Sequence, residues 1–200
     1  LKLCASLLIL RQKAVKILLI DNFDSFTFNL SHYLEGMGAE VSIIRENESK
    51  KNEADAFDKV IISPGSGLPN QRLGMMTVLQ ENMDKKPILG VCLGMQALVE
   101  VTGGKIFIQE IVKHGLQETI DREGESKLLN GVSAHFEVGL YHSWAVDIED
   151  SREWNVTSRS ESGIIMSIES NERPLFGVQF HPESIMTSEG KKILENFLAQ

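Results

Sequence analysis

Residues 87–101 read PILGVCLGMQALVEV, and this stretch decides the fold. The apolar run over residues 87–91 predicts a strand that is buried on both faces, and the spacing that follows predicts a helix over residues 93–101. The junction has the form Gly-x-Cys-x-Gly, which is typical of a nucleophile elbow with cysteine in place of serine. In such a sharp turn, small flanking residues leave room for the central side chain, here Cys92.

The same alternation extends along the first half of the chain. Strands are predicted at residues 15–20, 40–44, 59–62 and 87–91, and helices at residues 25–37, 71–83 and 93–101. Strands that alternate with helices of this length form right-handed βαβ units and a parallel sheet. The second half instead predicts closely spaced strands and a closing helix, at residues 135–141, 155–159, 164–169 and 175–180 and, for the helix, 189–198. We therefore expect an α/β fold, an open and mostly parallel sheet flanked by helices, with an antiparallel extension or small side sheet in the C-terminal half.

The composition indicates a folded domain and not a disordered or fibrous chain. Of the 200 residues, 42% are hydrophobic, and 20 Lys+Arg against 28 Asp+Glu give a formal net charge of -8. This negative charge argues against a protein that binds the phosphate backbone of nucleic acids. It favours a cytoplasmic protein that meets small molecules or another protein. We expect one domain over residues 15–200.

Residues 1–14 are predicted to be an extension outside this domain. The apolar run at residues 7–10 is too short to cross a membrane, which takes about 20 apolar residues. A secretory signal peptide is the alternative, but Arg11 and Lys13 interrupt the apolar stretch and no small-x-small cleavage site follows. Cys4 lies in this extension and is assigned no chemistry.

The titratable residues do not follow a metal-binding pattern. Two cysteines cannot build a disulfide framework, and the five histidines are scattered. Asp21 and Asp24 follow the first predicted strand, where a pair of acids more often caps a helix than binds magnesium. Phe23 and Phe26, in the same segment, are interpreted as packing residues. We predict no metal ion and no cofactor.

Cys92 becomes a candidate nucleophile because the sequence offers a base for it. His181 follows the strand predicted at residues 175–180, and Glu183 stands two residues later, where its carboxylate can orient the imidazole. The carboxyl ends of parallel strands meet at one edge of a sheet, which places Cys92 and His181 together. The alternatives are a buried structural cysteine and a loop histidine satisfied by a backbone carbonyl. The two motifs occurring together favour catalysis.

The same edge offers backbone N–H groups for a developing oxyanion. The helix that begins after Cys92 places the N–H of Leu93 beside the attacked atom, and its dipole stabilises a thiolate. A second donor is expected from the loop after the strand at residues 59–62. In that loop Gly65, Ser66 and Gly67 let the backbone approach a ligand closely.

Together these residues resemble a known family. The motifs that carry the resemblance are DNFDSFT at residues 21–27, SPGSG at 63–67, GVCLGMQ at 90–96, HG at 114–115, YHS at 141–143 and FGVQFHPES at 176–184. In this order they resemble the class I, triad-type glutamine amidotransferases, which have a flavodoxin-like fold. Within that family the chain is similar to the glutaminase subunits of anthranilate synthase and of aminodeoxychorismate synthase. The resemblance covers residues 15–200.

The resemblance implies a reaction and a partner. Cys92 would attack the side-chain amide of L-glutamine, His181 would act first as base and then as acid, and Glu183 would orient the imidazole. The positions that match the family's substrate contacts and oxyanion hole are Gln96, Ser143, Trp144, Leu93 and the loop residues Gly65, Ser66 and Gly67. The ammonia would pass to a separate chorismate-binding synthase subunit, in the first place for anthranilate synthesis.

The chain departs from the usual pattern of this branch at three places. Ser66 stands where proline is usual, residues 69–72 lack the usual acidic residues and alanine, and Leu116-Gln117 replace a basic-hydroxyl pair. These positions lie outside the triad and bear on the partner and on which amide completes the oxyanion hole. His114-Gly115 is interpreted as a turn, with a role near the active site and the partner face as the alternative.

Other functions stay open on these residues. The same chemistry could serve aminodeoxychorismate synthesis, or both pathways through one shared subunit, and the sequence does not separate these. A non-catalytic regulatory module on the same scaffold would be expected to lose one of Cys92, His181 and Glu183, and all three are present. A cysteine hydrolase acting on peptides or γ-glutamyl chains would not explain Gln96 and residues 141–143 in the family's order.

Overall fold

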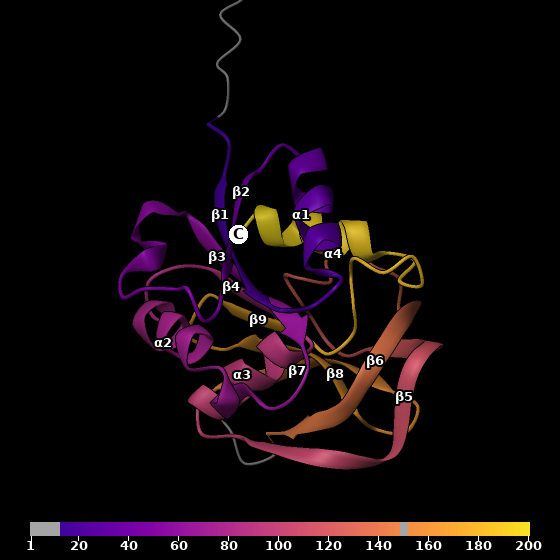
Figure 1. Cartoon of the computed structure of the whole chain (residues 1–200). Helices are drawn as coiled ribbons and strands as arrows, with labels where there is room; N and C mark the ends of the chain where they lie inside the picture. The colour runs from indigo at the N-terminus through magenta and orange to yellow at the C-terminus, as the bar shows by residue number, and fades with distance from the viewer. Residues whose placement is uncertain (1–12, 149–151) are drawn as a thin grey trace, which may run out of the picture.

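The described part of the chain, residues 13–148 and 152–200, forms one nine-stranded sheet in the computed structural model, in the order β2-β1-β3-β4-β9-β8-β7-β5-β6 (Figure 1). The strands are β1 (Lys16–Asn22), β2 (Glu40–Arg45), β3 (Lys59–Gly65), β4 (Ile88–Val91), β5 (Lys105–Arg122), β6 (His135–Asp147), β7 (Trp154–Ser160), β8 (Ile165–Ser170) and β9 (Leu175–Val178). The helices are α1 (Thr27–Gly36), α2 (Leu73–Asn82), α3 (Leu93–Val101) and α4 (Gly190–Leu198), with short 3-10 helices η1 (Glu53–Ala56) and η2 (Pro69–Gln71). Cys4 and residues 1–12 of the expected extension lie outside the described residues.

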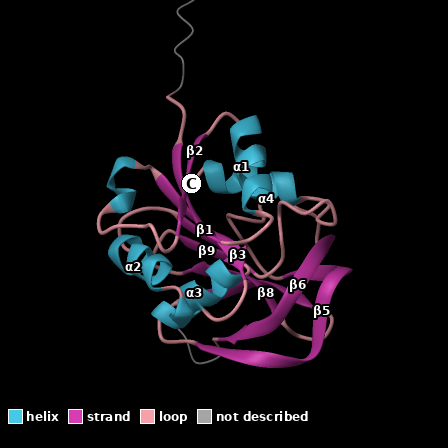
Figure 2. Cartoon of the chain, viewed as in Figure 1, coloured by secondary structure: helices cyan, strands magenta, loops and turns pink. Residues whose placement is uncertain are grey.

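The strands β2, β1, β3, β4 and β9 form the parallel half of the sheet. In β1 the side chains alternate between two layers of helices. Ile17 and Leu19 pack in the core cluster of α1 and α4, and Leu18 and Ile20 pack in that of α2 and α3. Figure 2 shows these two pairs of helices on the two sides of the strands. Burial on both faces explains why the sequence of β1 is apolar without alternation.

The C-terminal half extends this sheet and does not form a separate one. β8 pairs antiparallel with both β9 and β7, and β5 joins β7 through residues 120–122. The expected fold class, a mostly parallel α/β sheet flanked by helices, is therefore confirmed. The antiparallel part takes the form of an extension.

β5 is the element that the sequence did not predict. It pairs with β6 along most of its length, and its register shifts between Ile108 and Lys113 and again between His114 and Leu116. Gly115, at the second shift, has a φ of 70°, a conformation that favours glycine. The interpretation of His114-Gly115 as a turn is wrong, because these residues form a bulge inside a strand. β6 likewise continues past the expected end at residue 141.

β4 and β9 are neighbours, and α3 lies directly on both. Gly90 of β4 stands opposite Gly177 of β9. A Cβ atom on Gly90 would come within 2.4 Å of the backbone of Gly94, and one on Gly177 within 2.8 Å of Met95 Cγ. The two strands therefore end side by side at the N-terminus of α3. In the part of the chain that the structure describes, the helices lack the length and apolar character that a membrane crossing requires.

Candidate active site

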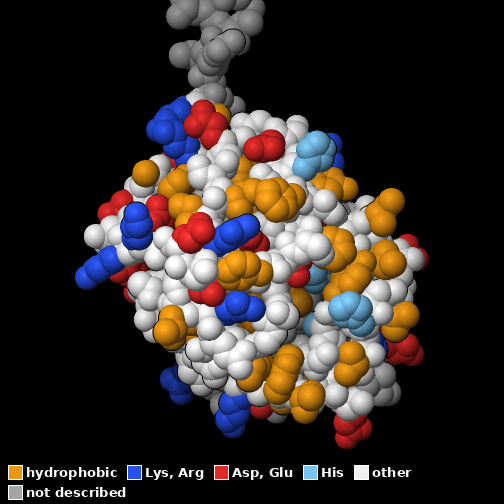
Figure 3. Space-filling view, viewed as in Figure 1, with side chains coloured by type: hydrophobic (Ala, Val, Ile, Leu, Met, Phe, Trp, Pro, Cys, Tyr) orange, Lys and Arg blue, Asp and Glu red, His pale blue; other side chains and the backbone are white. Residues whose placement is uncertain are grey.

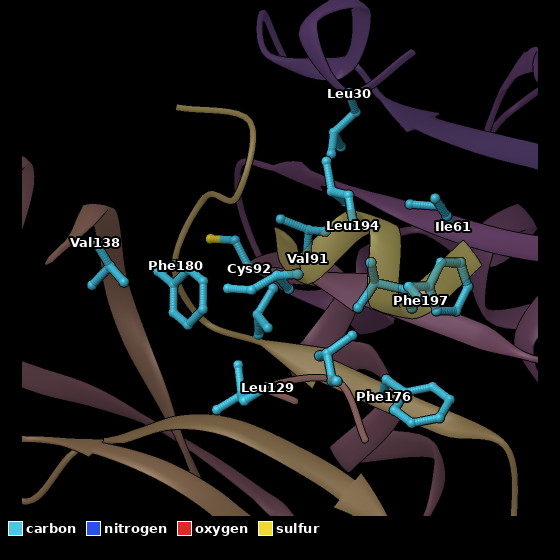
Figure 4. Packing of buried hydrophobic residues seen from close by; sticks show 14 of the residues in the cluster. Leu30, Ile61, Val91, Cys92, Leu129, Val138, Phe176, Phe180, Leu194 and Phe197 are labelled. Carbon is cyan, nitrogen blue, oxygen red and sulfur yellow. The ribbon is translucent and has the colours of Figure 1, made fainter. Parts of the chain in front are cut away.

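Cys92 lies at the sharp turn from β4 into α3. Its φ of 52° and ψ of -103° form a conformation that costs about 1–3 kcal/mol and persists where the surroundings hold it. Cys92 N donates to Val178 O of β9 at 2.7 Å, and Gln96 N donates to Cys92 O at 3.1 Å. The side chain is 6% exposed, and Figure 4 shows it beside Phe180 at the margin of the core cluster that includes Phe197. The elbow is thus built as the sequence pattern requires.

His181 and Glu183 lie on the turn that follows β9, next to this elbow. His181 Nδ1 and Glu183 Oε1 are 2.7 Å apart, and their side chains are 2% and 0% exposed. The backbone of the turn is fixed as well, because His181 N donates to Gly139 O and Ser184 N donates to His181 O, each at 3.2 Å. Nδ1 therefore carries a proton toward the carboxylate, and Nε2 is left for other contacts.

The surroundings of His181 favour its protonated form. Burial lowers the pKa of the imidazole, but hydrogen bonds and charge interactions with Cys92 and Glu183 outweigh burial and raise the pKa to about 10. Nε2 is buried and makes no hydrogen bond to the described residues, although the thiol of Cys92 lies near enough to raise the pKa of the ring. Such contacts often tighten when substrate binds. The arrangement can hold a thiolate–imidazolium pair.

Cys92 and His181 open into a cavity of about 330 Å³. The other site residues expected from the sequence that line it are Gln96, Ser143, Trp144, Gly65, Ser66 and Gly67. Leu93 and Glu183 are not on the wall of the cavity. Leu93 is the first residue of α3, and Glu183 contacts the far nitrogen of His181. The structure therefore brings every expected site residue to one place, around a space suited to a small molecule.

Arg72 holds the loop that carries Ser66 and Gly67. Arg72 Nη2 donates to Ser66 O at 3.1 Å, and its guanidinium lies 5.7 Å from the centroid of the Phe23 ring. Arg72 Nη1 is 3.6 Å from Glu46 Oε1. Ser66 and Arg72 belong to the segments at which the chain departs from the family pattern, and here they contact each other. Because a peptide group is planar, a fixed Ser66 carbonyl also fixes the direction of the Gly67 N–H.

Aromatic residues form another wall of the cavity. The ring centroids are 5.0 Å apart for Phe26 and Tyr141, 5.2 Å for Phe26 and His181, and 4.8 Å for Tyr141 and His181. These tilted contacts hold the plane of the imidazole. Phe26 packs against these rings as expected, and it also lines the cavity. Phe23 is instead 51% exposed, with the guanidinium groups of Arg45 and Arg72 over its ring.

A chain of side-chain amides runs from the cavity wall to the sulfur of Cys92. Gln96 Nε2 donates to Trp144 O and to Gln179 Oε1, each at 3.2 Å. Gln179 Nε2 donates to Cys92 Sγ at 3.6 Å. Sequence reasoning did not single out Gln179. The signal was a polar residue inside an apolar run that was expected to be buried, and Gln179 is indeed 0% exposed.

A second buried histidine, His142, also lines the cavity. Burial lowers its pKa to about 4, although a hydrogen bond with the Trp144 carbonyl favours the protonated form. His142 Nδ1 lies 2.9 Å from Trp144 O and 2.8 Å from Gln109 Nε2. Near neutral pH His142 is therefore neutral and His181 protonated. His114, for which a role near the active site was the alternative to a turn, lines the same cavity. Sequence reasoning named His142 only as part of a motif.

Asp21, near the end of β1, and Asp24, just after it, are occupied by the turn into α1. Asp21 Oδ1 accepts from Phe23 N at 3.0 Å and from Thr27 Oγ1 at 2.8 Å, and Asp24 Oδ1 accepts from Phe26 N at 2.8 Å. These bonds organise the turn that leads into α1. The expected helix cap is not formed, because Phe26 is the N-cap residue and no side chain of the described residues caps the first turn of α1. Over residues 13–148 and 152–200, no group of three or more His, Cys, Asp or Glu side chains is arranged to hold a metal ion.

Comparison with known proteins agrees with this geometry. The chain is 39% identical over 187 residues to anthranilate synthase component 2 of Lactococcus lactis, with 92% of this chain and 94% of that protein covered. It is 40% identical over 185 residues to aminodeoxychorismate synthase component 2 of Escherichia coli, with 91% and 98% covered. A solved structure of a glutamine amidotransferase from Thermotoga maritima shares the fold, with a TM-score of 0.71, 14% identity and 94% and 82% coverage.

The family model for glutamine amidotransferase class-I matches residues 18–200. This span contains every residue that builds the cavity, from the loop at Gly65 to the turn at Glu183. The chain therefore belongs to the class-I glutamine amidotransferases.

Proposed function

We propose that this chain hydrolyses L-glutamine to glutamate and supplies the ammonia to a chorismate-using synthase subunit, for the synthesis of anthranilate. The observation that carries the proposal is the cavity that is lined by both the elbow cysteine, Cys92, and His181, whose imidazole is paired with Glu183. The protonated form favoured at His181 and the helix N-terminus at Cys92 both support a thiolate there. We also propose a cytoplasmic location, where a cysteine stays reduced as this reaction requires.

In the first half-reaction the Cys92 thiolate attacks the side-chain amide carbon of glutamine. A C–S bond forms, and the carbonyl oxygen becomes an oxyanion that the N–H groups of Leu93 and Gly67 stabilise. The His181 imidazolium then gives its Nε2 proton to the amide nitrogen. The C–N bond breaks, ammonia leaves, and a glutamyl thioester remains.

In the second half-reaction the neutral imidazole of His181 takes a proton from water, which attacks the thioester carbon. The C–S bond breaks, glutamate leaves, and the thiolate–imidazolium pair is restored. Glu183 keeps the ring oriented through Nδ1 in both half-reactions.

The remaining lining residues suit the rest of the substrate. Both N–H groups of Gln96 are used by Trp144 O and Gln179 Oε1, so the side-chain oxygen of Gln96 is the atom that accepts a hydrogen bond from glutamine. Ser143 and Trp144 follow each other on β6 and line the cavity. They offer a hydroxyl and backbone groups to the amino-acid end of the substrate.

Exposed apolar side chains near the triad support a protein partner on this face. Ile185 is 96% exposed and Leu116 53%. Ile185 follows the triad turn directly, and Leu116 is adjacent to Gln117, whose amide donates to Met186 O at 2.8 Å. Figure 3 shows apolar side chains beside a histidine on the right of this view, in the region of β6 in Figure 1. Exposed apolar groups gathered near a site are typical of an interface, and we place the synthase subunit here.

The alternative is the same reaction in the synthesis of aminodeoxychorismate, or in both pathways. The relatives support the two pathways about equally, because the identity is 39% to an anthranilate synthase component and 40% to an aminodeoxychorismate synthase component. A Bacillus subtilis relative, 38% identical, is named for both synthases.

Assays with each of the two synthase subunits from the same organism test the proposal. Glutamine-dependent ammonia release and product formation are expected from the parent chain and not from Cys92→Ser. Ammonium salt in place of glutamine should restore product formation with Cys92→Ser, which controls for assembly of the complex. If product forms with only one of the two synthase subunits, that subunit identifies the pathway that this chain serves. Equal ammonia release from Cys92→Ser and the parent chain would refute the proposal.

A further inference from the structure

We propose that Gln179 is a further catalytic residue of this site, which donates a side-chain N–H to the Cys92 sulfur and stabilises the thiolate. The inference deepens the proposed function and rests on Cys92 being the nucleophile. The observation behind it is the contact of 3.6 Å between Gln179 Nε2 and Cys92 Sγ, between side chains that are 0% and 6% exposed. At this burial the amide is one of few groups that can reach the sulfur.

The direction of the contact follows from the chain of partners. Trp144 O is a backbone carbonyl and can only accept, so Gln96 must turn its nitrogen toward it. The same nitrogen lies 3.2 Å from Gln179, which must therefore present its oxygen to Gln96 and its NH₂ group to Cys92. A reversed Gln179 amide would set two NH₂ groups against each other and a carbonyl oxygen against a thiolate.

The backbone on both sides of Gln179 is fixed, so the donor is preorganised. Gln179 N donates to Met166 O of β8 at 2.8 Å. The preceding residue, Val178, accepts from Cys92 N at 2.7 Å. Main chain and side chain together tie the end of β9 to the elbow. A donor held in place in a buried site stabilises a negative charge without reorganising when the charge forms.

A purely structural role for Gln179 does not explain why its NH₂ group points at the sulfur of Cys92. Holding Gln96 requires the Gln179 oxygen alone. The NH₂ group faces sulfur, which is a weak acceptor as a thiol and a strong acceptor as a thiolate. With the imidazolium of His181 as the other donor, the sulfur of Cys92 has two groups that favour its anion.

The rate of Cys92 alkylation by iodoacetamide, measured against pH, tests the proposal. The full chain is used with Cys4→Ser, because Cys4 and Cys92 are the two cysteines of the sequence. Gln179→Met removes the N–H donor and keeps a similar side-chain volume. In this variant the midpoint, which is the pH at which the alkylation rate reaches half of its maximum, is expected to rise by about one unit or more, so that alkylation near neutral pH slows about 10-fold. Gln179→Glu sets a carboxylate against the sulfur and should raise the midpoint further.

Gln96→Met is a second, independent arm, because it removes the partner that orients Gln179 and leaves Gln179 itself in place. Its midpoint should rise, by less than in Gln179→Met. Asn82→Leu, which removes a buried amide on α2 that donates to Val78 O, is the matched control and should leave the midpoint unchanged. Circular dichroism shows which variants fold, and Gln96→Met decides the question if the Gln179 variants do not.

Unchanged midpoints in folded Gln179 variants, or in Gln96→Met where those variants fail to fold, would overturn the role of Gln179. Glutamine hydrolysis is measured in parallel with the synthase subunit present. A parent chain that reacts with iodoacetamide but releases no ammonia would refute the proposed function alone, because alkylation requires no glutamine.

Discussion

Replacement of Glu183 tests how the proton on His181 is held. Glu183→Gln keeps the volume and a hydrogen bond to Nδ1 but removes the negative charge, whereas Glu183→Ala removes both. The 2.7 Å contact lies between side chains that are 0% and 2% exposed, so water does not replace the lost charge. We expect the pKa of His181 to fall in both variants, and further in Glu183→Ala.

The size of the change follows from the kind of contact. A hydrogen bond to a charged group contributes about 1.5–3 kcal/mol and a neutral one about 0.5–1.5 kcal/mol, so Glu183→Gln should lower the pKa of His181 by roughly one unit. Loss of one partner from a buried ion pair costs about 3–5 kcal/mol, which in Glu183→Ala takes the pKa from about 10 to near neutral. Glutamine turnover should fall about 10-fold in Glu183→Gln and about 100-fold or more in Glu183→Ala, because the ring of His181 loses the partner that orients it and stabilises its charged form.

The free energy of unfolding should also depend on pH because of the raised pKa of His181. In the folded chain the pKa of His181 lies above its ordinary value of 6.5, so the folded state binds this proton more tightly than the unfolded chain. The stabilisation is complete below about pH 6.5, decreases as the pH rises, and is lost above about pH 10. Glu183→Ala should therefore be least stable relative to the parent at the acidic end of this range, and the difference should narrow toward pH 10.

Two measurements check this reasoning: an NMR titration of the His181 ring and urea unfolding at several pH values. Glu137→Gln, an exposed carboxylate on β6, is the matched control and should change the free energy of unfolding by no more than about 0.5 kcal/mol. A His181 pKa that stays near 10 in Glu183→Ala, or a stability difference that is the same at every pH, would show that Glu183 does not hold the proton.

Three further predictions concern the loop, the elbow and the second histidine. Arg72→Ala frees the Ser66 carbonyl and should lower kcat about 10-fold or more with little change in KM. Adding Ser66→Pro to Arg72→Ala should restore kcat. If steady-state kinetics show that kcat stays low in the double variant, the proposed role of Arg72 in holding the loop is contradicted. Gly90→Ala places a Cβ 2.4 Å from the backbone of α3 and should cost about 3 kcal/mol, whereas Gly36→Ala meets nothing within 4 Å and should be tolerated, as urea unfolding can check. Because the pKa of His142 is lowered to about 4, the chain should lose up to about 3 kcal/mol as the pH falls from 6.5 to 4. His142→Gln should flatten that part of the stability curve.

The sequence predicted the helices and strands in which buried apolar side chains recur at a regular spacing. The expected helix over residues 93–101 coincides with α3, and the strand at residues 87–91 differs from β4 by one residue. β5 was not predicted, because its two register shifts reset the alternation of apolar and polar side chains and leave no constant period to read. A charged strand with bulges therefore resembles a loop in sequence.

The same distinction applies to the candidate site. Cys92 and His181 could be placed together because parallel strands end at a common edge, which is a property of the topology. The contacts of Arg72 with Ser66 and of Gln179 with Cys92 could not, since each depends on side-chain positions that only the packed structure determines. Gln179 shows that a buried polar residue within an apolar run should be treated as a candidate even before its partner is known.

The pairing of β4 with β9 gives the enzyme a built-in order of events during synthesis. While a ribosome is still making the middle of the chain, the thiol at position 92 has neither its imidazole nor the main-chain carbonyl that anchors its turn. On the proposed mechanism, we therefore expect that a nascent or truncated polypeptide that stops short of residue 183 does not consume glutamine. The pairing of β4 with β9 would then restrict ammonia release to completed chains.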